Sequence, residues 1–192
     1  MQESKVIHWQ GCKRILRYLQ GTLNYGLYFT PGNKMEISTF TDADWGADRD
    51  DRKSTGGYCI FLAGNLVSWS SKKQKVVSTS STEAEYRSLS NGAAKLTWLQ
   101  SLLAEMNIKL EKRPIIWCDN KSAIALAENP VFHGRTKHIE IDVHFVRNKI
   151  SNREFDLKYV ESKNQVADIM TKALLNRSFE YLRSKLNVLA YD

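Results

Sequence analysis

Three short apolar runs follow one another directly in the first half of the chain, and a long helical pattern comes straight after them. The runs cover residues 35–42, 57–62 and 66–70, and a turn at 63–65 with a central glycine separates the last two. Consecutive runs of this kind, joined by turns, predict antiparallel strands. Residues 82–105 then repeat apolar side chains at helical spacing. The sheet is therefore expected to begin with three antiparallel strands.

The second half of the chain alternates strand and helix patterns. Strands are expected at 115–119 and 155–160, and helices at 121–127, 136–149, 165–175 and 178–187. An amphipathic helix over 4–20, with Trp9, Cys12, Leu16 and Leu19 on one face, and an extended stretch at 27–29 precede the first strand of the sheet. This order predicts an α/β fold in which helices cover a mixed sheet.

Size and charge narrow the class of protein. The 192 residues suit one domain of ordinary size with a short extension, and the net charge of +7 favours a polyanionic partner such as nucleic acid. Three widely spaced cysteines offer neither a CxxC pair nor a disulfide framework. With no apolar signal segment and no run of membrane-spanning length, we expect an intracellular, cytoplasmic protein without a membrane partner.

Four acidic residues stand in settings where a merely solvated charge is less expected. Asp42 and Asp119 follow apolar strand patterns, whereas Glu85 and Asp168 lie within helical patterns. Clustered carboxylates bind hard divalent cations, and a pair of such ions can clamp the attacking and leaving oxygens of a phosphodiester. If the fold brings the four together, the chain is a metal-dependent nuclease.

Each acid also has a structural alternative. Asp42 could be solvated or cap a turn at the strand end, with Asp44 as a rival, and Asp119 could cap the helix that follows it. Asp168 is expected about one turn into its helix. Ser80 and Glu83 form a Ser-x-x-Glu capping box, which gives Glu83 a sufficient structural role.

Glu85 lies about 200° around the helix from Glu83, one turn before Leu89. It is therefore predicted to face the sheet, where a charge is costly unless something binds it. Trp45, Trp69, Trp98 and Trp117 are expected in or near the core.

Five ordered segments together resemble type 1 ribonuclease H, and more closely the ribonuclease H domain of copia-type retrotransposon polyproteins. They are Lys-Lys-Gln at 72–74, Ser-Ser-Thr-Glu-Ala-Glu-Tyr at 80–86, Cys-Asp-Asn-Lys-Ser-Ala at 118–123, Arg-Thr-Lys-His-Ile at 135–139 and Val-Ala-Asp-Ile-Met-Thr-Lys at 166–172. The resemblance covers about 35 to 175. It implies a ribonuclease H-like fold with a five-stranded mixed sheet, three antiparallel strands and then two parallel ones, flanked by helices.

The resemblance also implies a domain division and a partner. Residues 1–34 resemble the connection from reverse transcriptase, 35–176 would be the ribonuclease H domain, and 177–192 a C-terminal helical extension. The expected partners are an RNA–DNA hybrid and the reverse transcriptase domain of the same polyprotein. In an active element the location would be a virus-like particle.

The chemistry that the resemblance implies is cleavage of the RNA strand of a hybrid with two Mg²⁺ or Mn²⁺ ions. Asp42 would bridge both ions, Glu85 and Asp119 would hold one, and Asp168 would hold the other. Many relatives carry a His in the loop before the last acidic helix, and here residues 161–165 contain none. His138 is a candidate substitute, although a polar surface position is the favoured interpretation of His133, His138 and His144.

Substrate contacts are a further expectation. Lys72, Lys73 and Lys75 could bind phosphates, and Ser81, Thr82 and Asn120 could bond riboses. The alternative makes the lysines a solvated loop and Ser81 and Thr82 ordinary first-turn helix residues.

Two other functions compete with the nuclease. A decayed element could leave a catalytically silent nucleic-acid-binding or assembly module, although all four acids are retained. An integrase-type strand transferase shares the fold, but its glutamate follows the second aspartate, whereas Glu85 precedes Asp119.

Overall fold

The centre of the molecule is a five-stranded mixed sheet in the strand order β4-β3-β2-β5-β6. A computed structural model describes residues 5–32, 34–129 and 139–191. The strands are β2 (Ile37–Ala43), β3 (Thr55–Leu62), β4 (Asn65–Lys73), β5 (Ile115–Cys118) and β6 (Asp156–Tyr159). The first three pair antiparallel, and β5 and β6 continue the sheet in parallel. The fold predicted from the sequence is thereby confirmed.

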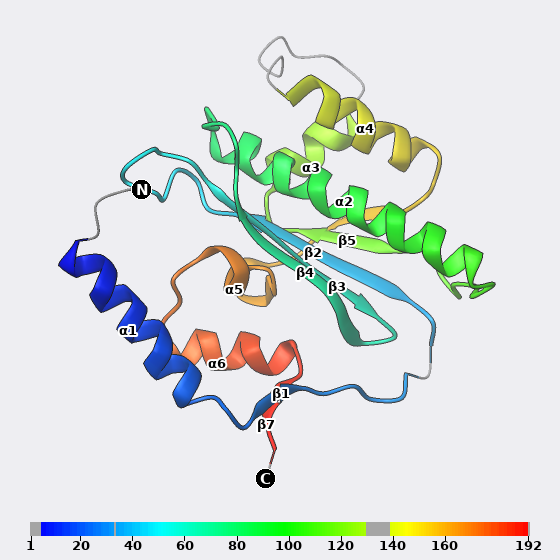
Figure 1. Ribbon diagram of the computed structural model, residues 1–192. Helices are drawn as coiled ribbons and strands as arrows, with labels where there is room; N and C mark the ends of the chain where they lie inside the picture. The colour runs from blue at the N-terminus through cyan, green and yellow to red at the C-terminus, as the bar shows by residue number, and fades with distance from the viewer. Residues whose placement is uncertain (1–4, 33, 130–138, 192) are drawn as a thin grey trace.

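Three helices cover one face of this sheet, as Figure 1 shows. They are α2 (Ser81–Glu105), α3 (Lys121–Glu128) and α4 (Glu140–Ser151). The α2 residues Leu89, Ala93 and Leu96 are fully buried, at the helical spacing expected from the sequence. They form the main core with Ile37, Ile60 and Ile116 of the strands.

A close approach between α2 and β2 fixes the distance between helix and sheet. A Cβ atom at Gly92 would lie 2.5 Å from Cγ2 of Thr41. Thr39 and Thr41 point toward this helix and are fully buried. The sheet therefore carries α2 at a short distance beside the strand that ends in Asp42.

The opposite face is covered by the C-terminal part of the chain. A 3-10 turn (Ser162–Asn164) leads to the short helix α5 (Asp168–Thr171) and then to α6 (Asn176–Lys185). Cys59, Phe61, Leu66, Val166 and Leu186 form a second, smaller core on this side. The two cores give the sheet a helical layer on each face.

A segment near residue 26 contacts the C-terminal part of the chain. Strand β1 (Tyr25–Leu27) pairs antiparallel with β7 (Val188–Ala190) in a separate two-stranded sheet (Figure 1). Helix α1 (Val6–Gln20) precedes β1, and none of its residues is buried. Its contact with the rest of the molecule includes the ring of Tyr18 against that of Phe179.

Several expectations about individual elements were wrong. Trp45, Trp69 and Trp98 are more than half exposed, because they lie beyond the end of β2, on the edge strand β4 and on the outer side of α2. Trp117 is partly buried and stacks on Phe40.

The boundaries of some elements also differ from those expected. The helix expected over 165–175 is reduced to α5, because a 3-10 turn and the buried Gln165 come before it. The helix expected over 136–149 begins at Glu140 among the described residues, and 136–138 lie outside them. Among the described helices, we find none with the length and apolar character to cross a membrane.

Candidate active site

Asp42 lies near the end of β2, the central strand, and its side chain is completely buried. The hydroxyl oxygen of Ser88 on α2 lies 2.7 Å from the carbonyl oxygen of Asp42 and 2.9 Å from that of Gly57, and its one proton is shared between these two acceptors. This hydroxyl joins β2, β3 and α2 at the point where the acid leaves the strand. The rival Asp44 has a structural role instead, because its carboxylate accepts from the backbone N–H of Thr55 at 2.6 Å.

The start of α2 separates Glu83 from Glu85. Ser80 is the N-cap and its side chain accepts from the N–H of Glu83, as the capping-box pattern predicts. Glu83 in turn accepts from the N–H and hydroxyl of Thr79 and forms an ion pair with Arg87. Its carboxylate is thus held by helix-start contacts.

Glu85 points to the other side of the helix, toward Asp42. It is 7% exposed, and its Oε2 atom is buried without a hydrogen-bond partner among the described residues. Burial, together with the charges of Asp42 and Asp119, raises the pKa of Glu85 to about 9. A carboxylate in this position needs a cation to stay ionised at neutral pH.

Asp119 follows directly after β5, which lies beside β2 in parallel. The next helix, α3, is capped by Asn120, whose side chain accepts from the N–H of Ala123. Asp119 is therefore not the helix cap, and its carboxylate is left for the site. It accepts from the hydroxyl of Ser162 at 2.9 Å.

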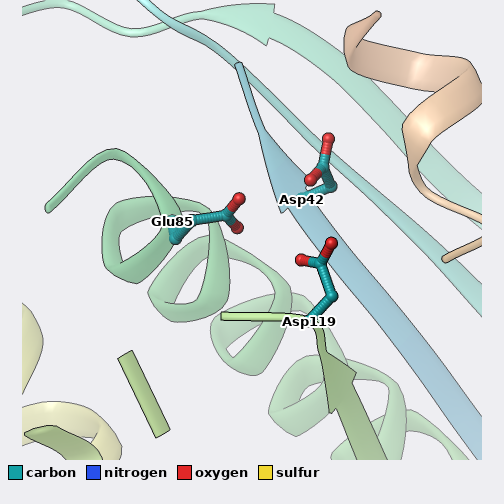
Figure 2. A group of neighbouring side chains, drawn as sticks. All are labelled: Asp42, Glu85 and Asp119. Atoms are coloured by element: carbon teal, nitrogen blue, oxygen red, sulfur yellow. The ribbon is translucent and has the colours of Figure 1, made fainter. Parts of the chain in front are cut away.

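These three acids converge on one point, as Figure 2 shows. One oxygen from each of Asp42, Glu85 and Asp119 can be chosen so that all lie within 4.8 Å of one another. Oxygen ligands from carboxylates are what Mg²⁺ and Mn²⁺ prefer. The unpartnered oxygen of Glu85 and its raised pKa fit a divalent cation at this point.

Asp168 lies beside this group rather than within it. It is the first residue of α5, not one turn into a helix as expected, and Ala167 occupies the N-cap position. Lys172 connects it to Asp42, because the ammonium lies 2.8 Å from Oδ1 of Asp168 and 3.1 Å from Oδ1 of Asp42. Burial raises the pKa of Asp168 to about 6, and the hydrogen bond from Lys172 opposes that rise.

The backbone before α5 is tied to β2. Gln165 is fully buried, and its side-chain amide donates to the carbonyl of Thr41 at 3.0 Å and accepts from the N–H of Ala167 at 3.2 Å. Asp168 therefore enters the site from a segment anchored one residue before Asp42.

A cavity of about 580 Å³ lies between the end of β4 and α2, and basic side chains border it. Lys72 and Lys75 line it and are exposed. Lys73 also lines it, but its ammonium forms ion pairs with Asp48 at 2.5 Å and Asp51 at 3.1 Å. Lys72 and Lys73 belong to strand β4, so the alternative interpretation as a solvated loop is wrong at these two positions.

The other residues expected to contact substrate have different surroundings. Ser81 and Thr82 begin α2 next to the site, and the side-chain oxygen of Asn120 is used in capping α3. His138 lies outside the described residues.

Sequence reasoning missed three side chains that contact the acids: Ser162, Thr171 and Lys172. Thr171 donates a hydrogen bond to Oδ2 of Asp42. A signal for Lys172 existed, because it lies four residues after Asp168 and would share its helical face.

Comparison with known sequences gives relatives over most of the chain, although no family model matches it. The retrovirus-related Pol polyproteins from transposons RE1 and RE2 of Arabidopsis thaliana are 48% and 46% identical over 94% and 95% of this chain. That from transposon TNT 1-94 of Nicotiana tabacum is 37% identical over 90% of it. The chain spans only 12–13% of the length of these relatives.

Comparison with solved structures gives the same fold at low identity. The N-terminal RNase H domain of rv2228c from Mycobacterium tuberculosis matches 78% of this chain and 97% of that chain, with a TM-score of 0.50 and 13% identity. LC11-RNase H1, solved in complex with an RNA/DNA hybrid, matches 71% of this chain and 94% of that chain, with a TM-score of 0.51 and 16% identity.

Sheet order and helical layers thus define a protein of the ribonuclease H-like fold, with an acidic centre at the ends of its two central parallel strands. Over most of its length, the chain is a homologue of retrovirus-related Pol polyproteins of the copia type.

Proposed function

We propose that this chain is a metal-dependent endoribonuclease that cleaves the RNA strand of RNA–DNA hybrids. The observation that carries the proposal is the convergence of Asp42, Glu85 and Asp119 within 4.8 Å, with one buried oxygen of Glu85 unpartnered among the described residues. Its relatives among retrotransposon Pol polyproteins and its ribonuclease H-like fold support the same conclusion.

In this proposal the chain supplies the ligands and their rigid support. Asp42, Glu85 and Asp119 would hold one divalent ion, and Asp42 with Asp168 would face a second. When bound, such ions lower the pKa of water and stabilise the charge that develops on a phosphate. Ser88 holds the backbone of Asp42 in place, so the point from which this carboxylate projects is fixed before any ion binds.

The basic cavity supplies the binding surface in this proposal. Lys72 and Lys75 are exposed in a cavity that is also lined by Ser88, the residue bonded to the backbone of Asp42. Neutralisation of backbone phosphates dominates affinity for nucleic acid. Ser81 and Thr82 begin α2 next to Glu85 and remain candidates for contacts with ribose hydroxyls.

A cleavage assay with three labelled duplexes tests the proposal. We expect cleavage of the RNA strand of a hybrid, but not of RNA or DNA duplexes, only when Mg²⁺ or Mn²⁺ is present. Asp42→Asn should abolish cleavage, because it removes the charge from the most buried acid of the site. Asp50→Asn is the matched control, since Asp50 lies in an exposed loop.

Folded protein that leaves the hybrid intact with Mn²⁺ would refute the proposal. Hybrid binding of normal affinity without cleavage would instead favour a catalytically silent binding module. The proposed setting is an intracellular polyprotein that also carries a reverse transcriptase, and a longer protein that includes that neighbour is the second one to assay.

A further inference from the structure

Both oxygens of the Asp42 carboxylate are engaged by side chains of the segment that ends α5. Oδ1 lies 3.1 Å from the ammonium of Lys172, and Oδ2 accepts from the hydroxyl of Thr171. Asp42 is also the one acid shared by the three-carboxylate group and the pair with Asp168. The position of the Lys172 ammonium therefore affects the binding of each cation that Asp42 can hold.

The ammonium of Lys172 stands where two carboxylates from different elements face each other. It lies 2.8 Å from Asp168, the first residue of α5, and 3.1 Å from Asp42 on β2. An ammonium has three donors and one positive charge, so it can satisfy two acids at once. Among the described residues, Asp168 does not belong to the three-acid group. The positive charge that it contacts is the ammonium of Lys172.

The Lys172 side chain also has access to solvent. It is 37% exposed, whereas the Asp42 side chain that it contacts is completely buried. Its backbone has already left the helix, since Lys172 is the C-cap of α5 and is extended. Rotation of the lysine side chain into solvent therefore requires no change in the sheet or in α5.

Charge balance favours an exchange between the ammonium and a metal ion. One divalent ion with the lysine gives three positive charges against four carboxylates, and two divalent ions give four. Two ions and the lysine together would exceed the negative charge of the site, and the like charges would repel one another at short range. The second ion and the ammonium are thus alternatives.

We propose that Lys172 is a built-in competitor for the second ion: its ammonium holds Asp42 and Asp168 together in the free protein and must swing out before a second ion binds. The inference rests on the metal centre of the proposed function. It makes the three-acid group the strong ion site and the Asp42–Asp168 pair a weaker site that opens by a side-chain movement.

Nuclear magnetic resonance of the lysine side chains tests the exchange directly. We expect the Lys172 ammonium to give a slowly exchanging signal without metal and to keep it through the first equivalent of Mg²⁺. As the second ion binds, the signal should move to that of a solvated lysine. A signal that is lost with the first ion, or that is unchanged when a second ion is bound, would overturn the inference.

Binding of Mn²⁺ to variants gives an independent test by calorimetry. Lys172→Met should raise the affinity for the second ion by roughly tenfold, the scale expected for the loss of two partly exposed ion pairs. The affinity for the first ion should change less. Lys172→Arg keeps the charge and should leave the second site weak. Lys163→Met, which removes a lysine paired with Glu161 on the surface, should match the wild type.

The outcomes distinguish the inference from the proposed function. If the hybrid is cleaved and two ions bind with the same affinities in Lys172→Met and wild type, the inference fails and the proposed function stands. If neither protein binds any ion, both fail.

Discussion

Glu83 and Glu85 lie two residues apart on one helix, and their surroundings differ completely. Glu83 is ion-paired with Arg87 and accepts hydrogen bonds from Thr79, and these contacts lower its pKa although burial acts to raise it. Glu85 faces two further acids, and burial with these charges raises its pKa to about 9. A period of 3.6 residues per turn, applied to the sequence, was enough to distinguish the two.

The raised pKa of Glu85 predicts how the stability of the metal-free protein depends on pH. An acid whose pKa is higher when folded stabilises the folded state at low pH, and this stability is lost as pH rises from about 4.5 to about 9. Asp168 adds a smaller loss in the same direction between about 3.8 and 6.

Glu85→Gln should therefore be more stable than wild type at pH 8 in EDTA, by up to about 5 kcal/mol, with little difference at pH 4.5. Urea unfolding at the two pH values measures this, and Glu180→Gln on the exposed side of α6 is the control. In saturating Mg²⁺, the wild type should instead be more stable than Glu85→Gln. Equal slopes of stability against pH in both proteins would contradict the prediction.

At the scale of elements, the end of β4 brings three lysines to one cavity but leaves them in different states. All three side chains are exposed, but the ammonium of Lys73 is ion-paired with Asp48 and Asp51. The sequence predicted all three as phosphate contacts because it could not show that the loop at 48–51 returns to the strand. The three lysines therefore differ in their ion pairs, which the residue type alone does not reveal.

Substitution of these lysines should separate their contributions to hybrid binding. Lys72→Gln and Lys75→Gln should each weaken binding and reduce the salt slope by about 1. Lys73→Gln is the matched control, since its charge is already used, and it should change the slope less. Fluorescence anisotropy at several salt concentrations measures all three, and an equal loss for Lys73→Gln would contradict this assignment.

The contact between α2 and β2 gives a second prediction at this scale. Gly92→Ala should destabilise the protein by about 1–3 kcal/mol, because the new Cβ would meet Thr41 at 2.5 Å and this overpacking outweighs the better helix propensity of alanine. Gly11→Ala in α1 is the control, with nothing within 4 Å of the added atom. Thermal unfolding of both proteins tests the difference.

At the scale of the whole molecule, a helical layer lies on each face of the sheet, and β1 pairs with β7 outside it (Figure 1). Helix α1 contributes no buried residue, whereas Leu186 and Val188 belong to or pack on the second core. The N-terminal helix and the C-terminal strand therefore differ in their importance for stability.

Truncation should show this difference. Removal of residues 1–20 should leave the melting temperature within about 2 °C of the wild type, because the loss is below about 1 kcal/mol. Removal of 186–192 should lower it by several degrees, since it uncovers the second core. Circular dichroism melting curves measure both, and a larger loss on removal of 1–20 would contradict the prediction.

Local patterns predicted three consecutive antiparallel strands and a mixed sheet covered by helices, whereas the five-stranded sheet with two parallel strands was expected only from the resemblance. Three runs joined by turns must pair in order, and the apolar positions of α2 repeat at helical spacing. Asp42, Glu85 and Asp119 could be selected because each stands at a definite point of such an element.

What could not be predicted depends on contacts between distant segments. The pairing of Tyr25 with Ala190 joins two three-residue strands far apart in the chain, and nothing local indicates it. The bridge from Lys172 to Asp42 depends on where α5 begins, and the sequence placed that helix too early. The exposure of Trp69 follows from its place on an edge strand, which its apolar character conceals.

The amide of Gln165 fastens the chain before Asp168 to the backbone of Thr41, one residue before Asp42. The distance between Asp42 and Asp168 is consequently held by a bond to the sheet. A larger cation could not widen it by displacing a loop. Mg²⁺, with bonds of about 2.1 Å, should fit better than Ca²⁺, which prefers about 2.4 Å. Calcium should then give a smaller thermal shift than magnesium at equal concentration, and Gln165→Ala should narrow that gap.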